Sequence, residues 1–290
     1  MKRPETIGII YNSWVPEAGE MTSALMERLN LKTRGWTCSA ADVDPQMPQA
    51  EATDLIITVG GDGTIIRAAG VSVPHGIPIL GINMGRLGFM TELEAEEAMD
   101  KVPQYIEWNA RVEERCMLQV DVTSQNAQGD ETVYHALNDA VVARGAMSRV
   151  IRIDASIDGA PLTQFRADAV MVATATGSTG YNLSVGGPIL APQASDMILK
   201  AVAPHVGMAP ALVLPSTSVV ELTVATDRPV MLSVDGHMDR DLAPGETVTV
   251  RSSPRRVRFL RAGTPNHFYE TLTRRLGFGG GQSSTRAIQY

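Results

Sequence analysis

The sequence predicts an N-terminal α/β domain, built on an open and mostly parallel sheet, followed by an all-β, sandwich-like domain. Three observations predict this fold class. Strand-like and helix-like runs alternate up to about residue 110, which is typical of a parallel sheet covered by helices. Beyond that point strand-like runs crowd together. Asp158-Gly159 and Asp235-Gly236 lie between such runs and are typical of hairpin turns.

Short apolar runs in the N-terminal half predict its strands. They are Thr6–Asn12, Trp36–Val43, Asp54–Val59 and Pro78–Asn83. The third run is β-branched almost throughout, which suits a strand covered on both faces. Two helices are predicted between the strands. Met21, Leu25 and Leu29 recur every four positions and predict the first, and Ile65–Ala69 predicts a short second one.

The C-terminal half is predicted to be rich in antiparallel strands. Its strand-like runs are Cys116–Thr123, Val133–Arg144, Val150–Ile157, Ala169–Ala173, Val219–Ala225, Val230–Val234, Thr247–Arg251 and Arg256–Leu260. We expect the linker near Trp108–Glu114, and therefore domains at 1–109 and 110–262. Residues 263–290 are expected to pack back on the N-terminal domain, with His267–Leu276 as a closing helix or strand and a loose end.

Composition narrows the class of protein. The chain has 290 residues, 44% of them hydrophobic, and a net charge of −7. That sign does not favour a nucleic-acid binder. The two cysteines, Cys38 and Cys116, lie far apart, so a disulfide framework is not expected and a reducing cytoplasm fits. The long uncharged stretches are broken by Pro, Gly, Ser or Thr, so we expect no membrane span.

The glycine-rich sequence Gly60-Gly61-Asp62-Gly63-Thr64 directly follows a predicted strand. Its three glycines let backbone N–H groups approach a phosphate closely. Ligands bind at the carboxyl ends of such strands, and the next helix adds its positive N-terminus. A carboxylate in a phosphate-binding turn needs a task, either accepting a proton from an attacking hydroxyl or holding Mg²⁺. The alternative is a tight turn without further function.

Three other polar motifs fit a nucleoside. Thr174–Pro188 is dense in hydroxyls and glycine and holds one aromatic residue, Tyr181. It suits a nucleoside, with a solvent loop as the alternative. Asn138-Asp139 interrupts an apolar run and could bind ribose hydroxyls or an adenine edge, or form an Asx turn. Arg166-Ala167-Asp168 could form an internal ion pair or orient a ligand.

In this order the motifs resemble those of the NAD kinase family, which phosphorylates NAD to NADP. The matching segments are Gly60–Thr64 (GGDGT), Gly81–Phe89 (GINMGRLGF), Asn138-Asp139, Arg166–Asp168, Thr176–Pro188 (TGSTGYNLSVGGP), Pro204-His205, Ser233–Gly236 (SVDG) and Phe268–Phe278 (FYETLTRRLGF). GGDGT alone is shared with diacylglycerol, sphingosine and phosphofructokinase-like kinases. The ordered set is more specific and spans almost the whole chain.

The resemblance implies a reaction and its components. The γ-phosphoryl of ATP, or of another donor such as polyphosphate, would pass to the 2′-hydroxyl of the adenosine ribose of NAD. Mg²⁺ or another divalent metal would assist, and no metal ligand is assigned. Small nucleotides would be the binding partners, with neither nucleic acid nor a membrane. The assembly would be a homodimer or homotetramer in the cytoplasm.

The resemblance also implies a role for each matching residue. Asp62 would be the catalytic carboxylate and would contact NAD. The phosphate-binding turn would comprise Gly60, Gly61, Gly63 and Thr64. The other NAD-binding residues would be Gly63, Arg67, Phe89, Asn138, Asp139, Arg149, Arg166, Asp168, Thr176, Thr179, Gly180, Tyr181, Asn182, Leu183 and Ser184. The chain departs from the usual family pattern at Ala169, Ala175, Gly180 and Val185, each a small or apolar exchange beside intact polar positions.

Two alternatives remain open at this point. A lipid kinase of the diacylglycerol type also contains GGDGT, but it predicts a membrane-facing apolar or basic surface, which the acidic composition does not favour. A non-catalytic dinucleotide sensor of the same fold predicts loss of the catalytic carboxylate, whereas Asp62 is present.

Overall fold

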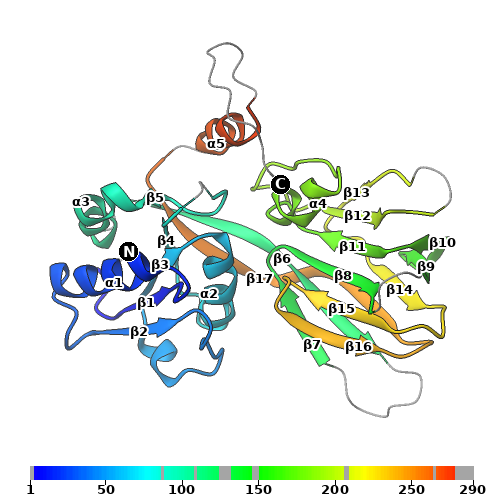
Figure 1. Cartoon of the computed structure of the whole chain (residues 1–290), viewed down its shortest axis with the longest axis horizontal. Coiled ribbons are helices and arrows are strands. Elements are labelled where there is room, and N and C mark those ends of the chain that lie inside the picture. Colours follow the sequence, from blue (N-terminus) through cyan, green and yellow to red (C-terminus); the bar gives the residue numbers. More distant parts are fainter. Residues whose placement is uncertain are drawn as a thin grey trace.

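The structure is a computed structural model that describes residues 3–85, 88–107, 110–123, 132–145, 150–205, 209–263 and 266–277. It contains two sheets with helices on the N-terminal part of the larger one (Figure 1). In chain order the elements are β1 Ile7–Tyr11, α1 Pro16–Arg28, β2 Gly35–Ser39, η1 Pro48–Ala52, β3 Leu55–Gly60, α2 Asp62–His75, β4 Ile79–Asn83, β5 Leu93–Glu94, α3 Ala95–Ile106, β6 Arg111–Thr123, β7 Thr132–Ala136, β8 Asp139–Arg144, β9 Ile151–Ile157, β10 Ala160–Ala167, β11 Ala169–Ala173, η2 Gly177–Thr179, α4 Tyr181–Ser184, β12 Met197–Val202, β13 Leu212–Leu214, β14 Val220–Val224, β15 Val230–Val234, β16 Met238–Leu242, β17 Thr247–Arg261 and α5 His267–Leu276.

The larger sheet is shared by both halves of the chain. Its order is β10-β9-β14-β17-β4-β3-β1-β2, with β5 beside β4, β6 beside β17 and β7 beside β6. Strands β1 to β4 pair in parallel, as predicted for the N-terminal half. β17 pairs in parallel with β4 at Phe259 and Ile79, and antiparallel with β6 and β14. β17 therefore carries this sheet across the domain boundary that we expected near residue 110.

Helices cover both faces of the parallel strands. On one face, Ile57 and Val59 of β3 pack with buried residues of α1 and α3. On the other face, Ile56 packs with Ile65 and Ala68 of α2. The β-branched run of β3 is buried throughout, which confirms the prediction of a strand covered on both faces.

The second sheet has six antiparallel strands in the order β13-β12-β11-β8-β15-β16. It packs on the antiparallel part of the larger sheet through one hydrophobic core. Val142 and Leu232 contribute to this core from the smaller sheet, and Val120, Leu222 and Val250 contribute from the larger. The predicted fold class, an α/β part followed by a β-sandwich, is confirmed.

Several elements differ from the prediction. The run Val133–Arg144 is two strands, β7 and β8, which lie in different sheets. The runs Thr247–Arg251 and Arg256–Leu260 are one strand, β17, with a register shift between Ser252 and Arg256. The short helix predicted over Ile65–Ala69 is the longer α2. Helix α3 and strands β5, β10, β12, β13 and β16 were not predicted.

The hairpins and the C-terminal helix follow the prediction. Asp158-Gly159 turns β9 into β10 and Asp235-Gly236 turns β15 into β16, all four residues having positive φ. His267–Leu276 is the helix α5, and Gly277 ends it in the left-handed region. The end that we expected to be loose, 278–290, lies outside the described residues. Within the described ranges, no helix has the length and apolarity needed to cross a membrane.

Candidate active site

Asp62 is the first residue of α2. Strand β3 ends at Gly60, and Gly61 is the extended residue that precedes the helix. Asp62, Gly63 and Thr64 thus form the first helical turn. The N–H of Thr64 donates to the carbonyl oxygen of Gly61 at 3.0 Å, whereas the N–H groups of Asp62 and Gly63 precede the first hydrogen bond of the helix. The positive end of the helix dipole adds to these donors. This local structure favours an anionic ligand beside the glycine motif.

The carboxylate of Asp62 is held by the loop that follows β4. One oxygen accepts a hydrogen bond from the N–H of Phe89 at 2.9 Å, and the other accepts from the N–H of Met90 at 3.0 Å. The loop approaches so closely that a Cβ atom on Gly88 would overlap Asp62 Oδ1 and Thr91 Oγ1. The structure therefore brings Phe89 next to Asp62, while Arg86 and Leu87 lie outside the described residues.

Helix α5 covers the Phe89 side of this loop. The ring centroids of Phe89 and Phe268 lie 6.2 Å apart. The guanidinium of Arg275 lies 4.5 Å from the centroid of the Phe89 ring, which is cation–π contact distance. The C-terminal helix thus supports a residue expected to contact NAD.

The Asn138-Asp139 pair is fixed by Asp235. The Asp235 carboxylate accepts hydrogen bonds from the N–H groups of Leu137, Asn138 and Asp139 at 2.7, 2.7 and 3.0 Å. Leu137 is fully buried in the core formed with Ile65 of α2 and Met90. The polar pair therefore lies against the element that carries Asp62. Asp235, which the sequence indicated as a hairpin turn and as part of the SVDG motif, positions this pair.

The Thr174–Pro188 loop is joined to the same pair. The N–H of Thr174 donates to the carbonyl oxygen of Asn138 at 2.8 Å, and its hydroxyl donates to that of Leu137 at 2.6 Å. A Cβ atom on Gly177 would overlap the backbone of Asn138. Glycine at position 177 is thus what allows the two segments to touch, and the structure places the segment that contains Thr176 beside Asn138.

Inside this loop, some polar groups are used internally and others are left without partners. Ser178 and Asn182 are fully buried, and the Asn182 amide donates to the carbonyl oxygens of Ser178 and Pro188. By contrast, Thr176 Oγ1 and Asn138 Oδ1 are buried without a hydrogen-bond partner among the described residues. Unsatisfied buried atoms are costly, so both fit a ligand with hydroxyl or amino groups. Tyr181 is 44% exposed and offers a stacking face.

Two hollows flank the first turns of α2, and Arg67 lines both. One is a cavity of about 360 Å³ between α2 and the β15–β16 hairpin, lined by apolar side chains and by Asp235 and His237. The other, of about 310 Å³, is lined by Gly61, Gly63 and Thr64. His237 was missed in the sequence, although it directly follows the SVDG motif.

Two predicted NAD-binding residues, Arg166 and Asp168, lie on or directly after β10, which is far from β3 in the strand order of the larger sheet. Arg166 lies on β10, the strand at the opposite edge of the larger sheet from β2 (Figure 1). Asp168 forms an ion pair with Arg144 at 3.1 Å. Arg149 lies outside the described residues. The remaining predicted positions, Thr179, Gly180, Leu183 and Ser184, lie on η2, α4 and their junction.

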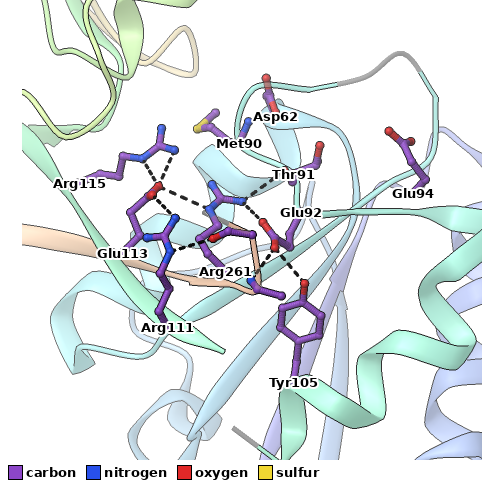
Figure 2. A network of polar contacts seen from close by, with 12 residues as sticks. Asp62, Met90, Thr91, Glu92, Glu94, Tyr105, Arg111, Glu113, Arg115 and Arg261 are labelled. Atoms are coloured by element: carbon purple, nitrogen blue, oxygen red, sulfur yellow. Dashed lines mark hydrogen bonds and ion pairs between the residues drawn. The ribbon is translucent and has the colours of Figure 1, made fainter. Parts of the chain in front are cut away.

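A buried network of charged side chains lies behind the Asp62 loop (Figure 2). Arg115 donates to Glu113 at 2.7 and 2.9 Å, and Arg261 donates to Glu92 at 3.1 Å. Burial alone would raise the pKa of Glu113, but Arg115 and Arg261 outweigh it and lower that pKa to about 2. The network was not predicted, because it joins Arg111, Glu113 and Arg115 of β6 to Glu92 and Arg261, which are distant in the chain.

Asp139 titrates near neutrality. Burial, and then the neighbouring Asp235, raise the pKa of Asp139 to about 7. Burial also raises the pKa of Asp235, whereas the three N–H donors oppose that rise. A carboxylate that accepts three N–H groups is favoured in its charged form. We therefore assign the proton of this pair to Asp139 below about pH 7.

We expect Asp139→Asn to remove a pH dependence of stability. The folded-state pKa of Asp139 lies above that of an unfolded aspartate, near 4, so its contribution is complete at pH 4 and is lost as the pH rises through about 7. The wild type should lose roughly a few kcal/mol relative to Asp139→Asn between pH 5 and 8. Urea unfolding across that range measures it. The exposed Asp241→Asn is the control and should keep the wild-type slope.

A magnesium ion would find few protein ligands here. Within the described ranges, no three His, Cys, Asp or Glu side chains are grouped so that they could hold a metal. Magnesium at phosphate sites commonly takes one or two carboxylates, with phosphate and water as its other ligands. Asp62 supplies one carboxylate, and the donor set fits a metal held mainly by the substrate's phosphates.

Family models match both halves of the chain. Residues 13–110 match the ATP-NAD kinase N-terminal domain, and residues 137–262 match the ATP-NAD kinase C-terminal domain. An NAD kinase of Dehalococcoides mccartyi is 40% identical over 272 residues, which cover 93% of this chain and 95% of that protein. An NAD kinase of Chloroflexus aurantiacus is 35% identical over 278 residues, covering 94% and 98%.

Solved structures of the same kind superpose over nearly the whole chain. Yeast NADH kinase complexed with NADH has a TM-score of 0.84 at 25% identity, covering 98% of this chain and 91% of that one. An NAD kinase from Archaeoglobus fulgidus in complex with ATP has a TM-score of 0.74 at 25% identity, covering 92% and 98%. These similarities extend through both sheets.

Proposed function

This chain belongs to the NAD kinase family and is an NAD kinase, and from that premise we propose how its own residues transfer a phosphoryl group to NAD. The main observation that supports the proposal is the position of Asp62 in the structure. It begins α2, beside free backbone donors, and its carboxylate is oriented by the Phe89 and Met90 amides. The Asn138 segment packs against the same helix through Leu137.

In the proposed reaction, Asp62 accepts the proton of the adenosine ribose 2′-hydroxyl. The hydroxyl oxygen attacks the γ-phosphorus of the donor, and the bond from that phosphorus to ADP breaks. Such a transfer needs mainly positioning and electrostatic stabilisation. A divalent ion, when bound, would neutralise charge on the phosphates. Asp62 is the carboxylate that we propose as its protein ligand.

NAD would be oriented by the segments that meet at Asn138. The side-chain oxygens of Asn138 and Thr176 that lack hydrogen-bond partners would accept hydrogen bonds from the adenosine, and Tyr181 would stack on an aromatic ring of NAD. Asp139 would accept from a ribose hydroxyl in its charged form. Phe89 would cover a base, and Arg67 would face the phosphates. The buried Asn182 would support this loop from within.

The donor would occupy the hollow of about 310 Å³ beside Gly61, Gly63 and Thr64. Backbone N–H groups at the start of α2 suit a chain of phosphates, and Arg67 adds a positive charge. ATP is the donor that we propose, and polyphosphate would present the same groups to this hollow.

The test is formation of NADP. Purified protein is incubated with NAD, ATP and Mg²⁺, and NADP is detected with an NADP-specific dehydrogenase. We expect NADP with ATP, and none after EDTA removes the metal. Polyphosphate replaces ATP, and NADH replaces NAD, in parallel reactions. Undiminished turnover in EDTA would contradict the proposed metal requirement, and turnover with polyphosphate alone would contradict ATP as the donor.

We propose a homodimer or homotetramer in the cytoplasm. Leu162 and Val213 are exposed by 41% and 50% beside a hollow of about 560 Å³ that Arg166 also lines. An exposed apolar face of this kind favours association. The free thiols of Cys38 and Cys116 fit a reducing compartment. Light scattering that gave a 31.1 kDa particle would contradict the assembly.

A further inference from the structure

The loop between β4 and β5 makes two sets of contacts in immediate succession, and Figure 2 shows the second of them, with Arg261. The N–H groups of Phe89 and Met90 donate to the carboxylate of Asp62. The next two residues, Thr91 and Glu92, contact Arg261 instead. Arg261 Nη1 donates to the Thr91 carbonyl oxygen at 3.2 Å and to Glu92 Oε2 at 3.1 Å. We call these last two contacts the Arg261 clamp.

Arg261 is held rigidly at the end of β17. Its side chain is 7% exposed, and its guanidinium lies 4.9 Å from the centroid of the Phe259 ring. Its Nε lies 3.5 Å from Glu113 Oε1, and Arg115 and Arg111 also pair with Glu113. Ion pairs and ring packing therefore surround the guanidinium of Arg261.

The loop is fixed at Glu92 as well. Glu92 Oε1 accepts from the hydroxyl of Tyr105 at 2.9 Å and from the N–H of Ala262 at 2.8 Å, and the other oxygen, Oε2, faces Arg261. The N–H of Glu92 donates to Gly81 of β4. Residues 91 and 92 are consequently tied to α3, β4 and β17 at once. The side chains of Phe89 and Met90 pack on α5 and in the core beside α2, whereas the backbone N–H groups of both residues donate to Asp62.

We propose that Arg261 is a positioning residue for the phosphoryl transfer: through the Arg261 clamp it holds the Phe89 and Met90 amides against the carboxylate of Asp62. Arg261 itself touches neither reacting atom. This inference rests on the proposed role of Asp62. Its physical basis is that a buried ion pair contributes little net stability, whereas a displacement of a catalytic group by about 1 Å can lower a rate by about 10²-fold.

The experiment compares variants that open the clamp in different ways. Arg261→Met removes the charge and all donors. Arg261→Lys keeps the charge but offers a single ammonium. Glu92→Gln keeps the acceptor for Tyr105 and Ala262 and turns an N–H₂ group toward Arg261. The matched control is Arg258→Met, on the same strand, which loses a half-exposed pair with Glu114 and an exposed hydrogen bond to the Gly76 carbonyl oxygen.

Four quantities are measured for each variant. They are kcat and KM for NAD below the melting temperature, the stoichiometry of NAD binding by calorimetry, and amide hydrogen exchange. We expect kcat per NAD-binding site to fall by about 10²-fold in Arg261→Met and Glu92→Gln, with KM within about twofold of wild type. Arg261→Lys should recover part of kcat. Exchange should accelerate over 88–92 and stay unchanged in β3, and Arg258→Met should match wild type.

Several outcomes would overturn the inference. One is wild-type kcat with unchanged exchange over 88–92 in Arg261→Met or Glu92→Gln. Another is a loss of turnover in proportion to the loss of NAD-binding sites, with kcat per site unchanged. That result would show that the network has a purely structural role. If Arg261→Met does not fold, Glu92→Gln and Arg261→Lys decide. If Asp62→Asn keeps its turnover, the proposed role of Asp62 fails, and the exchange data still show separately whether the clamp orders the loop.

Discussion

We expect Asp62→Asn to lower kcat by about 10²- to 10⁴-fold and to leave the dissociation constant for NAD within about twofold of the wild-type value. Asparagine has the shape of aspartate but cannot accept the proton of the 2′-hydroxyl. NAD is proposed to be held elsewhere, by Asn138, Asp139 and Thr176. Turnover is followed by NADP formation, and NAD binding is followed by calorimetry.

The same substitution also has a structural cost. Both oxygens of Asp62 accept backbone N–H groups, from Phe89 and Met90. The asparagine N–H₂ group would face one of those donors, so we expect a loss of about 1–3 kcal/mol in the free energy of unfolding. Asp54→Asn is the matched control, because Asp54 also accepts two backbone N–H groups, from Glu5 and Thr6. It should keep its turnover, and retained turnover in Asp62→Asn would refute the proposed catalysis.

Gly177→Ala is expected to weaken NAD binding by more than about tenfold and to lower the free energy of unfolding by about 1–3 kcal/mol. The new methyl group would overlap the backbone of Asn138, which cannot rotate away as a side chain could. Either Asn138 or the loop of Thr176 must move. The hydrogen bond between Thr174 and the Asn138 carbonyl oxygen would then be strained or lost.

Calorimetric titration with NAD and urea unfolding measure the two effects of Gly177→Ala. Gly19→Ala is the control, since a Cβ atom there meets nothing within 4 Å. It lies inside α1, where alanine is favoured over glycine by about 1 kcal/mol. We expect Gly19→Ala to bind NAD normally and to be slightly more stable. Normal NAD affinity in Gly177→Ala would show that close contact between the two segments is not required.

The elements that were predicted correctly are those whose structure follows from their own local residue pattern. The β-branched run of β3, and the Asp-Gly pairs of the two hairpins, need no distant partner to be identified. β10 was missed because it is an edge strand whose residues are mostly exposed, so it lacks an alternating apolar pattern. The single strand β17 looked like two because its register shifts beside Pro254, where a ladder hydrogen bond cannot form.

The residues of the candidate site also divide into those that the sequence predicts and those that it does not. Asp62, Asn138 and Thr176 lie in motifs that are recognisable locally, and the structure places their segments against one another. The Arg261 clamp could not be predicted, because it joins residues about 170 positions apart and consists of charges that a sequence normally places on the surface. Arg166 shows the opposite case. Its motif is recognisable in the sequence, but within one chain Arg166 lies far from Asp62.

The position of β17 bears on how the chain folds during synthesis. Phe259 and Leu260 contribute to the cores on opposite faces of the N-terminal parallel strands. β17 also covers β4 along the sheet. A nascent chain that has left the ribosome only as far as residue 250 therefore lacks the partner of Ile79 at the edge of β4 and has two incomplete cores. Contacts so distant in sequence slow folding, and an open edge invites pairing with other chains. The core of the N-terminal half is therefore complete only when β17, residues 247–261, has been synthesised.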